Sequence, residues 1–329
     1  MRNSKARAWF LPVLLVLLVQ CNNNPPMPGG DTFKMPMKKS VLLSNGETYA
    51  YLEQEPEQAQ PEEEVFLLIH GNFSSSAHMA PLFRYLNHAR LLAPDMRGFG
   101  DSSYNSGFSS LGELAEDIKL FTDALGISKV HVVGWSLGGG IALELAVLYP
   151  DLVSSLFIVQ GMSHRGMPFF KIGPGGTFVP YSGKDDMATF SIYIQQEAAL
   201  KAKDADFFER SWNNSIYTNK KPTSAENTIY LTETLKQRCL LDVYWSLAWF
   251  NLSGVSNGYT GGNATIGSLA CPVTFTCALN DLVIVPAVIR DNAQAVPGSK
   301  LIEYKNCGHS PLVDNPQQLA EDIRAHVGN

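Results

Sequence analysis

Residues 130–140 decide the fold, and they read Val-His-Val-Val-Gly-Trp-Ser-Leu-Gly-Gly-Gly. The apolar first part predicts a buried strand, and the spacing within 137–148 predicts a helix directly after it. The turn between them matches G-x-S-x-G, in which a strained serine needs small neighbours, here Gly134 and Gly138. We therefore expect the Ser136 hydroxyl to stand above a sheet, where the positive end of the following helix points.

Buried strands and helices alternate on both sides of this turn. Such alternation is typical of a parallel sheet with helices on both faces, so the sequence predicts an α/β fold. An Asn-Gly turn at 45–46 also joins two short strands within 40–54. The other expected strands are 65–69, 90–93, 130–133, 153–159, 273–278 and 301–304, and the expected helices are 78–87, 111–125, 137–148, 286–295 and 316–326.

The alternation is interrupted between Gly161 and Leu269. This stretch is rich in Met, Phe, Tyr and Trp, and it has helical spacing near 186–201, 204–212 and 225–250. Ligands in open α/β folds bind outside the carboxyl ends of the strands. The inserted segment therefore predicts a mainly helical lid over that edge of the sheet.

A serine hydroxyl needs a general base to act as a nucleophile. Among seven histidines, His309 follows the last expected strand and so lies at the same edge of the sheet as Ser136. Asp281 follows the neighbouring strand and is expected to fix the tautomer of His309. Two alternatives stay open: Asp95 as the acid, although its surroundings resemble a structural turn, and His164 as a substrate contact.

The loop after the first buried parallel strand, residues 70–76, reads His-Gly-Asn-Phe-Ser-Ser-Ser. Acyl transfer needs hydrogen-bond donors for the developing oxyanion. We expect one donor to be the backbone N–H of Asn72 or Phe73, and the other to be that of Leu137, next to the nucleophile. His70 is expected to brace this loop rather than to take part in the chemistry.

Taken together, these ordered motifs resemble those of the α/β-hydrolase superfamily with a cap domain, over residues 40–329. The resemblance implies a mostly parallel sheet of the eight-stranded type and the catalytic order Ser136, Asp281, His309. It implies that a carboxylic ester is cleaved through an acyl-enzyme, and we predict no cofactor and no metal. Aspartate at position 136 would have implied an epoxide hydrolase or a dehalogenase, so Ser136 argues against both.

Two finer features are similar to intracellular-type poly(3-hydroxybutyrate) depolymerases of bacilli. One is the loop 70–76, and the other is Phe-Asn-Leu-Ser at 250–253, followed by Asn-Gly at 257–258 and Gly-Gly at 261–262. The similarity implies an ester with an apolar or hydroxyacyl group, extending to 3-hydroxyalkanoate oligomers or polymers. The apparent export signal departs from an intracellular enzyme.

The lid is expected to supply an apolar acyl pocket, because ligand sites are mostly lined by apolar side chains. Packing within the lid is the alternative use of the same residues. The candidate substrate-binding residues are Trp135, Met162, Met167, Phe169, Phe170, Trp245, Trp249 and Phe250.

Composition and charge exclude several classes of protein. The 329 residues are 45% hydrophobic, which suffices for a sizeable core, and five cysteines are too few for a disulfide scaffold. A formal net charge of −6 repels phosphate backbones, so we expect no nucleic-acid partner. Cys277 and Cys307 end neighbouring strands, and the sequence leaves open whether they form a disulfide or are free thiols.

The first 21 residues resemble an export signal. Three cations precede an apolar run at 9–19, which is shorter than the ~20 residues of a membrane-spanning helix. Cys21 stands where a lipoprotein carries its acylated cysteine, but Gln20 is not the small residue expected before it. Lipoprotein, plain secretion and an uncleaved anchor therefore stay open.

The sequence thus predicts an exported ester hydrolase, whether secreted, periplasmic or lipid-anchored, with a cytoplasmic location as the alternative. Its membrane contact would be limited to the N-terminal segment. Three rival functions are a cofactor-free perhydrolase or haloperoxidase, an aminopeptidase for short peptides, and a binding protein that keeps the fold. The predicted parts are a signal at 1–21, a linker at 22–39, the hydrolase core at 40–162 and 269–329, and the lid at 163–268.

Overall fold

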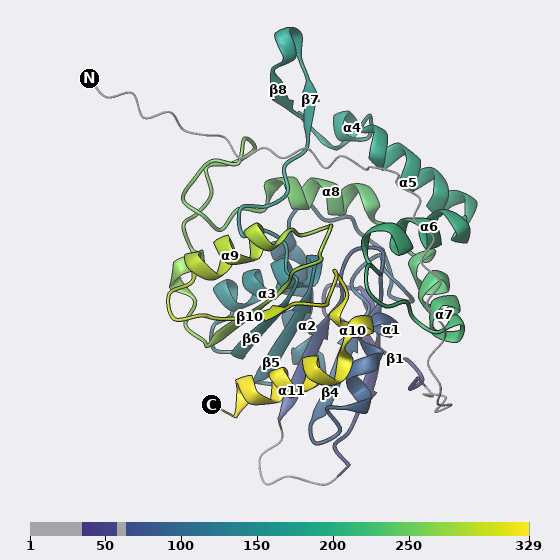
Figure 1. Ribbon diagram of the computed structural model, residues 1–329, viewed down its shortest axis with the longest axis vertical. Coiled ribbons are helices and arrows are strands. Elements are labelled where there is room, and N and C mark those ends of the chain that lie inside the picture. Colours follow the sequence, from purple (N-terminus) through teal and green to yellow (C-terminus); the bar gives the residue numbers. More distant parts are fainter. Residues whose placement is uncertain (1–34, 58–63, 329) are drawn as a thin grey trace. The chain divides into compact units, whose positions relative to one another are not determined.

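The computed structural model describes residues 35–57 and 64–328 (Figure 1). The predicted signal at 1–21 and the predicted linker up to residue 34 lie outside the described residues. The end of that linker is already structured, because the first strand begins at Lys39.

Eight strands form one sheet in the order β1-β2-β4-β3-β5-β6-β9-β10. The pairs β1–β2 and β2–β4 are antiparallel, and the other neighbours are parallel. The expected α/β fold with a mostly parallel sheet of eight strands is therefore confirmed. The strands are β1 (Lys39–Leu42), β2 (Thr48–Gln54), β3 (Val65–Ile69), β4 (Arg90–Pro94), β5 (Val130–Trp135), β6 (Val153–Val159), β9 (Val273–Ala278) and β10 (Lys300–Tyr304).

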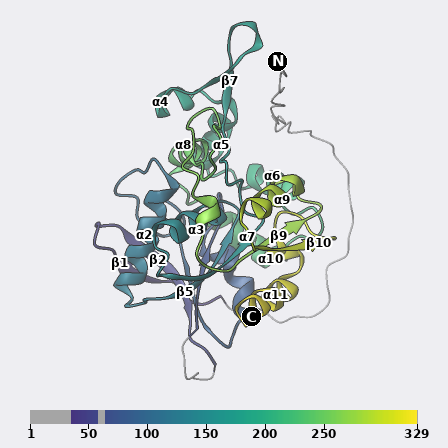
Figure 2. The same ribbon diagram turned by 90° about the vertical axis from the view of Figure 1, so that its left-hand side faces the viewer.

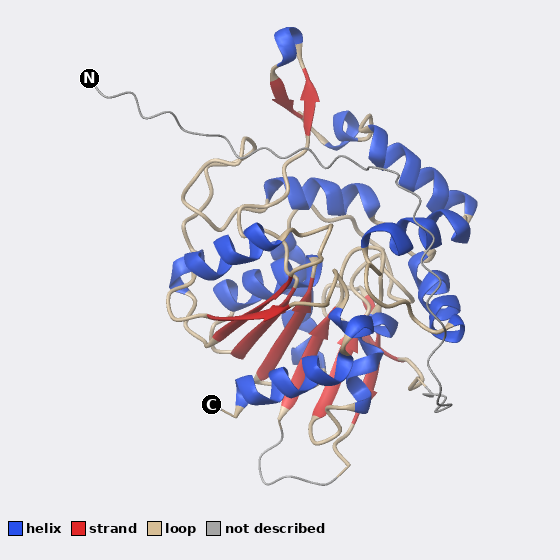
Figure 3. Ribbon diagram, viewed as in Figure 1, coloured by secondary structure: helices blue, strands red, loops and turns tan. Residues whose placement is uncertain are grey.

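Strand β3 shows how the sheet is covered on both faces. Val65, Leu67 and Ile69 belong to one hydrophobic cluster, whereas Phe66 and Leu68 belong to the other. This alternation follows from the two-residue period of a strand, and all five side chains are buried. Figure 3 shows the helices on either side of the strands.

Helices of the hydrolase core supply both clusters. The first cluster includes α2 (Leu111–Ala124), α3 (Leu137–Leu148) and α9 (Pro286–Ala295). The second includes α1 (Ser76–Met79), the 3-10 helix η1 (Ala80–Arg84), α10 (Pro311–Asp314) and α11 (Pro316–Val327). A further short 3-10 helix, η3 (Ile266–Ser268), precedes β9.

The helix expected at 78–87 is replaced by α1 and η1, which together end at Arg84. Pro81 lies in the first turn of η1. Because proline has no N–H and its ring opposes the preceding helical turn, a continuous α-helix through this position is unfavourable. The prediction of a single helix there was wrong.

The segment in which the sequence predicts a lid lies between β6 and η3, and it is called the lid below. Strands β6 and β9 pair directly although this segment separates them in sequence. In Figures 1 and 2, the hairpin of β7 and β8 stands off from the lid helices. The sequence did not predict this hairpin, and the single helix expected at 225–250 is two helices separated by 235–239. The lid elements are β7 (Phe170–Ile172), η2 (Pro174–Gly176), β8 (Phe178–Pro180), α4 (Lys184–Met187), α5 (Ser191–Ala202), α6 (Ala205–Ser215), α7 (Ser224–Thr234) and α8 (Leu240–Trp249).

Over the two described ranges, each helix is too short or too polar to cross a membrane.

Candidate active site

Ser136 lies between β5 and α3 in a backbone conformation that side chains rarely adopt. Its φ is 55° and its ψ is −116°. Such a geometry costs about 1–3 kcal/mol and persists only where the surroundings fix it. Here the Ser136 N–H donates to the Val159 carbonyl at 3.0 Å, and its carbonyl accepts from the N–H groups of Gly139 and Met162 at 3.0 and 3.2 Å.

Two glycines make this sharp turn sterically feasible. A Cβ at Gly134 would lie 2.5 Å from the Gly138 carbonyl oxygen, and a Cβ at Gly138 would lie 2.2 Å from that of Ile69. Both contacts are with backbone atoms, which cannot rotate away. The G-x-S-x-G pattern is thus explained by the contacts of α3 with β5 and with the end of β3.

The structure brings Ser136, His309 and Asp281 together from three separate loops. The Ser136 Oγ lies 2.9 Å from His309 Nε2, and His309 Nδ1 lies 2.8 Å from Asp281 Oδ2. The second oxygen, Asp281 Oδ1, accepts from the N–H groups of Val283 and Ile284 at 2.7 and 2.9 Å. Both His309 and Asp281 are buried, so the arrangement is largely shielded from water.

His309 is held through its main chain as well as through its ring. The indole Nε1 of Trp135 donates to the His309 carbonyl at 2.8 Å. Next to it, the Gly308 N–H donates to Asp314 Oδ2 at 2.7 Å. A Cβ at Gly308 would meet Thr218 Oγ1 of the lid at 2.1 Å, so the lid packs directly against the histidine loop.

The loop 70–76 passes beside the serine. A Cβ built on Gly71 would lie 3.1 Å from Ser136 Cβ. The Phe73 N–H, one of two expected oxyanion donors from this loop, donates instead to Gln237 Oε1 at 3.0 Å. Asn72 therefore remains the loop candidate, together with Leu137, the first residue of α3.

His70 braces this loop, as its sequence context suggested. Its Nε2 accepts from the Met96 N–H at 3.0 Å, and its Nδ1 lies 2.8 Å from the Gly71 carbonyl. Burial lowers the pKa of His70 below its ordinary value, so the neutral ring is favoured at neutral pH. The ring thus joins the loop to the residues that follow β4.

Asp95, the alternative acid, lies in a charged cluster behind the loop 70–76. Its carboxylate accepts from the N–H groups of Ser76 and Asp101 at 2.8 and 2.9 Å. The Lys38 ammonium lies 2.8, 2.8 and 2.6 Å from Asp95, Asp101 and Glu233, in that order. The carboxylates of Asp95, Asp101 and Glu233 lie as close together as the ligands of a metal ion would. The Lys38 ammonium supplies the positive charge among them. Asp95 thus has a structural role, as its sequence context suggested.

The candidate substrate-binding residues fall into two groups. Trp135, Met162 and Phe250 are buried in the hydrophobic clusters, and Met162 also binds the Ser136 carbonyl through its N–H. The other five, like Phe250, lie in the lid, where rings pack on one another: the ring of Phe169 on Phe190 and Tyr244, and that of Trp245 on Trp249. Met167 and Phe169 are partly buried and pack against the hydrophobic clusters. The ring of Phe170 contacts those of Phe178 and Tyr259. Trp249 is exposed.

His164 lies at the start of the lid without reaching the serine by any contact described. Its N–H and its Nδ1 both meet Asn292 Oδ1 at 2.9 Å. Asn292 in turn donates to the Met162 carbonyl at 2.9 Å. These bonds join the first residues of the lid to α9, so His164 has a structural partner.

The four cysteines within the described residues are free thiols, so Cys277 and Cys307 form no disulfide. Cys277 Sγ lies 3.8 Å from the Pro286 carbonyl and Cys307 Sγ lies 3.6 Å from the Gly308 carbonyl. Burial raises the pKa of both thiols. The sequence left open whether these two cysteines form a disulfide or are buried free thiols, and the structure shows free thiols. The other two free cysteines are Cys239 and Cys271.

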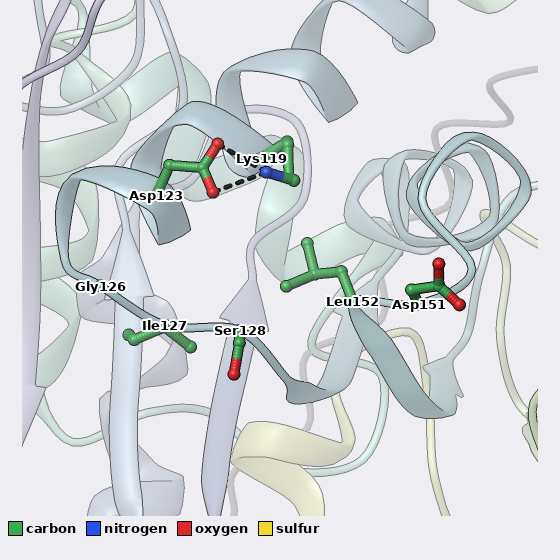
Figure 4. Close-up of a pocket in the computed structure, with 7 residues that line it drawn as sticks. All are labelled: Lys119, Asp123, Gly126, Ile127, Ser128, Asp151 and Leu152. Atoms are coloured by element: carbon green, nitrogen blue, oxygen red, sulfur yellow. Dashed lines mark hydrogen bonds and ion pairs between the residues drawn. The ribbon is translucent and has the colours of Figure 1, made fainter.

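A surface hollow lies away from this site (Figure 4). Lys119 and Asp123 form an ion pair of 2.5 Å there. The hollow lies near the amino ends of β5 and β6, whereas Ser136 follows the carboxyl end of β5. It is therefore separate from the candidate active site. Its lining residues are Lys119, Asp123, Gly126, Ile127, Ser128, Asp151 and Leu152.

Sequence reasoning missed two side chains that support the site, and it assigned a third, Trp135, to substrate binding only. Gln237 and Thr234 of the lid bind the loop 70–76, and the indole N–H of Trp135 binds the histidine loop. Trp135 follows the expected strand and precedes the serine. This position is the sequence feature from which its supporting role could have been inferred. No spacing in the sequence links Gln237 to Phe73, because 164 positions separate them.

Comparison with known proteins shows matches over most of the chain. The family model for the alpha/beta hydrolase fold matches residues 64–316. The chain is 23% identical to Lipase 1 of Psychrobacter immobilis, over 97% of this chain and 96% of the lipase. It is 22% identical to bifunctional epoxide hydrolase 2 of Sus scrofa, over 70% of this chain and 45% of that protein. The crystal structure of a probable hydrolytic enzyme from Pseudomonas aeruginosa is similar in fold, with a TM-score of 0.68 and 20% identity over 90% of this chain and 96% of that one.

Proposed function

Because the chain belongs to the α/β-hydrolase fold family, we propose that it is a serine hydrolase that cleaves carboxylic esters. One observation carries the proposal: two contacts of 2.9 and 2.8 Å link Ser136 Oγ through the His309 imidazole to Asp281. The similarity to a lipase over nearly the full length of both chains supports an ester as the substrate.

The reaction begins at Ser136. His309 Nε2 takes the hydroxyl proton as Ser136 Oγ attacks the ester carbonyl, and Asp281 stabilises the resulting imidazolium through Nδ1. The tetrahedral intermediate collapses when His309 returns the proton to the leaving alcohol, which leaves an acyl group on Ser136. Water, deprotonated by His309, then attacks the acyl-enzyme; the bond to Ser136 Oγ breaks as His309 returns the proton to this oxygen, and the carboxylic acid leaves.

Two backbone N–H groups stabilise the oxyanion in this mechanism. One belongs to Leu137 at the start of α3, where the helix dipole adds positive potential. The other belongs to Asn72, because the neighbouring Phe73 N–H donates to Gln237. Removing one such donor typically slows an enzyme by roughly 10²–10³-fold, so these groups matter to the rate.

The proposed substrate carries an apolar or hydroxyacyl group. Support comes from the aromatic side chains of the lid, which pack as a continuous set around Tyr244, Phe169 and Phe190. Oligomers or polymers of 3-hydroxyalkanoates are the finer proposal, based on the loop 70–76 and the segment 250–262. We keep a perhydrolase or haloperoxidase on the same three residues as the second candidate, to be distinguished by peroxide-dependent halogenation.

The function is tested with p-nitrophenyl esters of increasing chain length and with 3-hydroxyacyl esters, each offered to wild type and to Ser136→Ala. We expect hydrolysis by wild type and a loss of at least roughly 10³-fold in the variant. Equal rates for the two proteins would reject the mechanism. If wild type cleaved only short peptides, the assignment would change from an esterase to an aminopeptidase.

Export is a separate part of the proposal. The basic and apolar start of the chain, followed by Cys21, supports processing at or near this residue. Expression of the full chain in a bacterial host fed with labelled palmitate distinguishes the outcomes. Label lost on Cys21→Ser supports a lipoprotein, an unlabelled secreted product supports plain secretion, and full-length protein in the cytoplasm contradicts export.

A further inference from the structure

We propose that Gln237, in the lid, is a positioning residue for the oxyanion hole. Its side chain holds the loop 70–76 in the geometry that the proposed ester hydrolysis requires, so this inference rests on the proposed function. Gln237 lies in the segment between α7 and α8 and is only 4% exposed. It contacts neither Ser136 nor His309 by any hydrogen bond described, so its effect on catalysis passes through Asn72 and Phe73.

Gln237 uses both ends of its amide on the loop. Its Oε1 accepts from the Phe73 N–H at 3.0 Å, and its Nε2 donates to Asn72 Oδ1 at 2.8 Å. A glutamine satisfies one donor and one acceptor at the same time, as this pair of contacts requires. The amide therefore fixes the main chain of Phe73 and the side chain of Asn72 relative to each other.

A second lid residue binds the other backbone polar group of Phe73, in the next peptide unit. Thr234 Oγ1 donates to the Phe73 carbonyl at 2.6 Å. Phe73 has a φ of 55°, in the left-handed region where a bulky side chain is unfavourable. The conformation of Phe73 is thus maintained by hydrogen bonds from the lid to its N–H and its carbonyl, rather than by local preference.

The lid segment that carries Gln237 is itself firmly attached to the core. The Arg238 N–H donates to the Gly98 carbonyl at 2.8 Å. Lys236 Nζ lies 2.7 Å from both Asp101 and Glu233. These contacts anchor the residues on either side of Gln237, so Gln237 is held in place. Gln237 therefore links the core loop after β4 to the loop 70–76.

The consequence concerns the reacting atoms directly. The loop 70–76 approaches the nucleophile so closely that a Cβ on Gly71 would lie 3.1 Å from Ser136 Cβ. A shift of about 1 Å in such a loop is enough to slow catalysis by roughly 10²-fold. Gln237 also occupies the Phe73 N–H, so Asn72 is the loop donor. The lid thereby selects which amide of the loop serves the oxyanion.

The test uses Gln237→Met, which removes both contacts, and Gln237→Glu, which keeps an acceptor for Phe73 but loses the donor to Asn72. Gln195→Met is the matched control, because Gln195 is an exposed lid glutamine on α5. Active sites are counted from the burst of p-nitrophenol, so that kcat refers to folded enzyme. Affinity for a trifluoromethyl ketone, which forms a tetrahedral adduct, reports on the oxyanion hole.

We expect kcat per active site to fall roughly 10- to 100-fold in Gln237→Met, with KM within about twofold of wild type. The affinity for the trifluoromethyl ketone should fall by the same factor as kcat/KM, since both measure stabilisation of the tetrahedral oxyanion. Gln237→Glu should show a smaller loss of the same kind, and Gln195→Met should match wild type.

Unchanged kcat per active site in both Gln237 variants would overturn the proposal, as would a rise in KM with kcat retained. A loss explained wholly by fewer titratable sites would assign Gln237 a purely structural role and would also reject it. Ser136→Ala is measured in the same series. If that variant retained activity, the proposed function itself would fail, whatever the Gln237 variants showed.

Discussion

The indole N–H of Trp135 donates to the main-chain carbonyl of His309 at 2.8 Å, so the residue before the nucleophile holds the loop of the base. Trp135 is also buried, and its ring lies 5.8 Å from that of His309 between centroids. The strand end that presents Ser136 therefore also sets the position of the imidazole that is to deprotonate it.

Trp135→Phe is predicted to reduce kcat roughly tenfold with little change in KM. Phenylalanine keeps most of the packing but leaves the His309 carbonyl without its donor, at a cost of about 1–3 kcal/mol. Steady-state kinetics and thermal unfolding check this. Trp212→Phe is the control, because Trp212 is a buried lid tryptophan that packs on Trp135. A similar loss of kcat in both variants would show that packing, not the hydrogen bond, is responsible.

Asp281→Asn is predicted to lower kcat by roughly 10⁴-fold with little loss of stability. The amide oxygen can still accept from Val283 and Ile284, so the loop stays folded, while the amide nitrogen faces His309 Nδ1 and imposes the wrong tautomer. Asp185→Asn, an exposed lid position, is the control for a lost carboxylate. The assignment of Asp281 fails if its variant retains kcat within about tenfold of wild type.

Gly138→Ala is predicted to destabilise the fold by about 3 kcal/mol, through overpacking against backbone. The new Cβ would lie 2.2 Å from the Ile69 carbonyl oxygen, so α3 must move away from β3. Gly183→Ala is the matched control, since a Cβ there meets nothing within 4 Å. Urea unfolding of both variants measures the difference. Equal stability of the two would contradict the steric explanation of the second glycine in G-x-S-x-G.

Lys38→Met is predicted to lower the free energy of unfolding by about 2 kcal/mol at neutral pH, because it leaves Asp95 without its cation and Glu233 with Lys236 alone. Although burial opposes it, the charge of Asp95 and the hydrogen bonds to the acids raise the pKa of Lys38. Despite burial, Lys236 and Lys38 lower the pKa of Asp101.

The pH dependence of the Lys38 effect follows from these directions. A raised pKa gives stability that is complete below the ordinary value of 10.5 and is lost as the pH rises through the folded value. A lowered pKa gives stability that is complete above the ordinary value of 3.8 and is lost as the pH falls through the folded value. The difference between wild type and Lys38→Met should therefore be constant between these limits and shrink in acid. Lys201→Met, at an exposed pair, is the control. A difference that grew in acid would contradict the prediction.

The sequence predicted the parts of the fold that depend on local pattern. The continuous apolar run at 65–69 predicted β3 with the bounds observed, since a strand buried on both faces is apolar throughout. The bounds of β6 were also as expected, although that strand contains two serines. The sequence also predicted that Ser136, Asp281 and His309 lie close together, because each follows a parallel strand and the carboxyl ends of such strands share one edge.

Features that depend on tertiary contacts were not predictable in this way. The break between α7 and α8 lies where Gln237 and Arg238 bind the loops after β3 and β4, and helical spacing continues through it. The Phe73 N–H, one of the two expected loop donors, is bound by Gln237, which is distant in sequence. Helix propensity and periodicity carry no information about such partners.

The most direct measurement is to label the protein with a fluorophosphonate and to locate the adduct by mass spectrometry, in wild type and in Ser136→Ala. If Ser136 is the nucleophile activated by His309, wild type should carry one adduct, on Ser136. The fraction of ester-hydrolysing activity that is lost should equal the fraction of protein that is labelled. The variant should stay unlabelled and inactive. An adduct on another residue that persists in Ser136→Ala, together with retained ester hydrolysis, would contradict a mechanism based on Ser136.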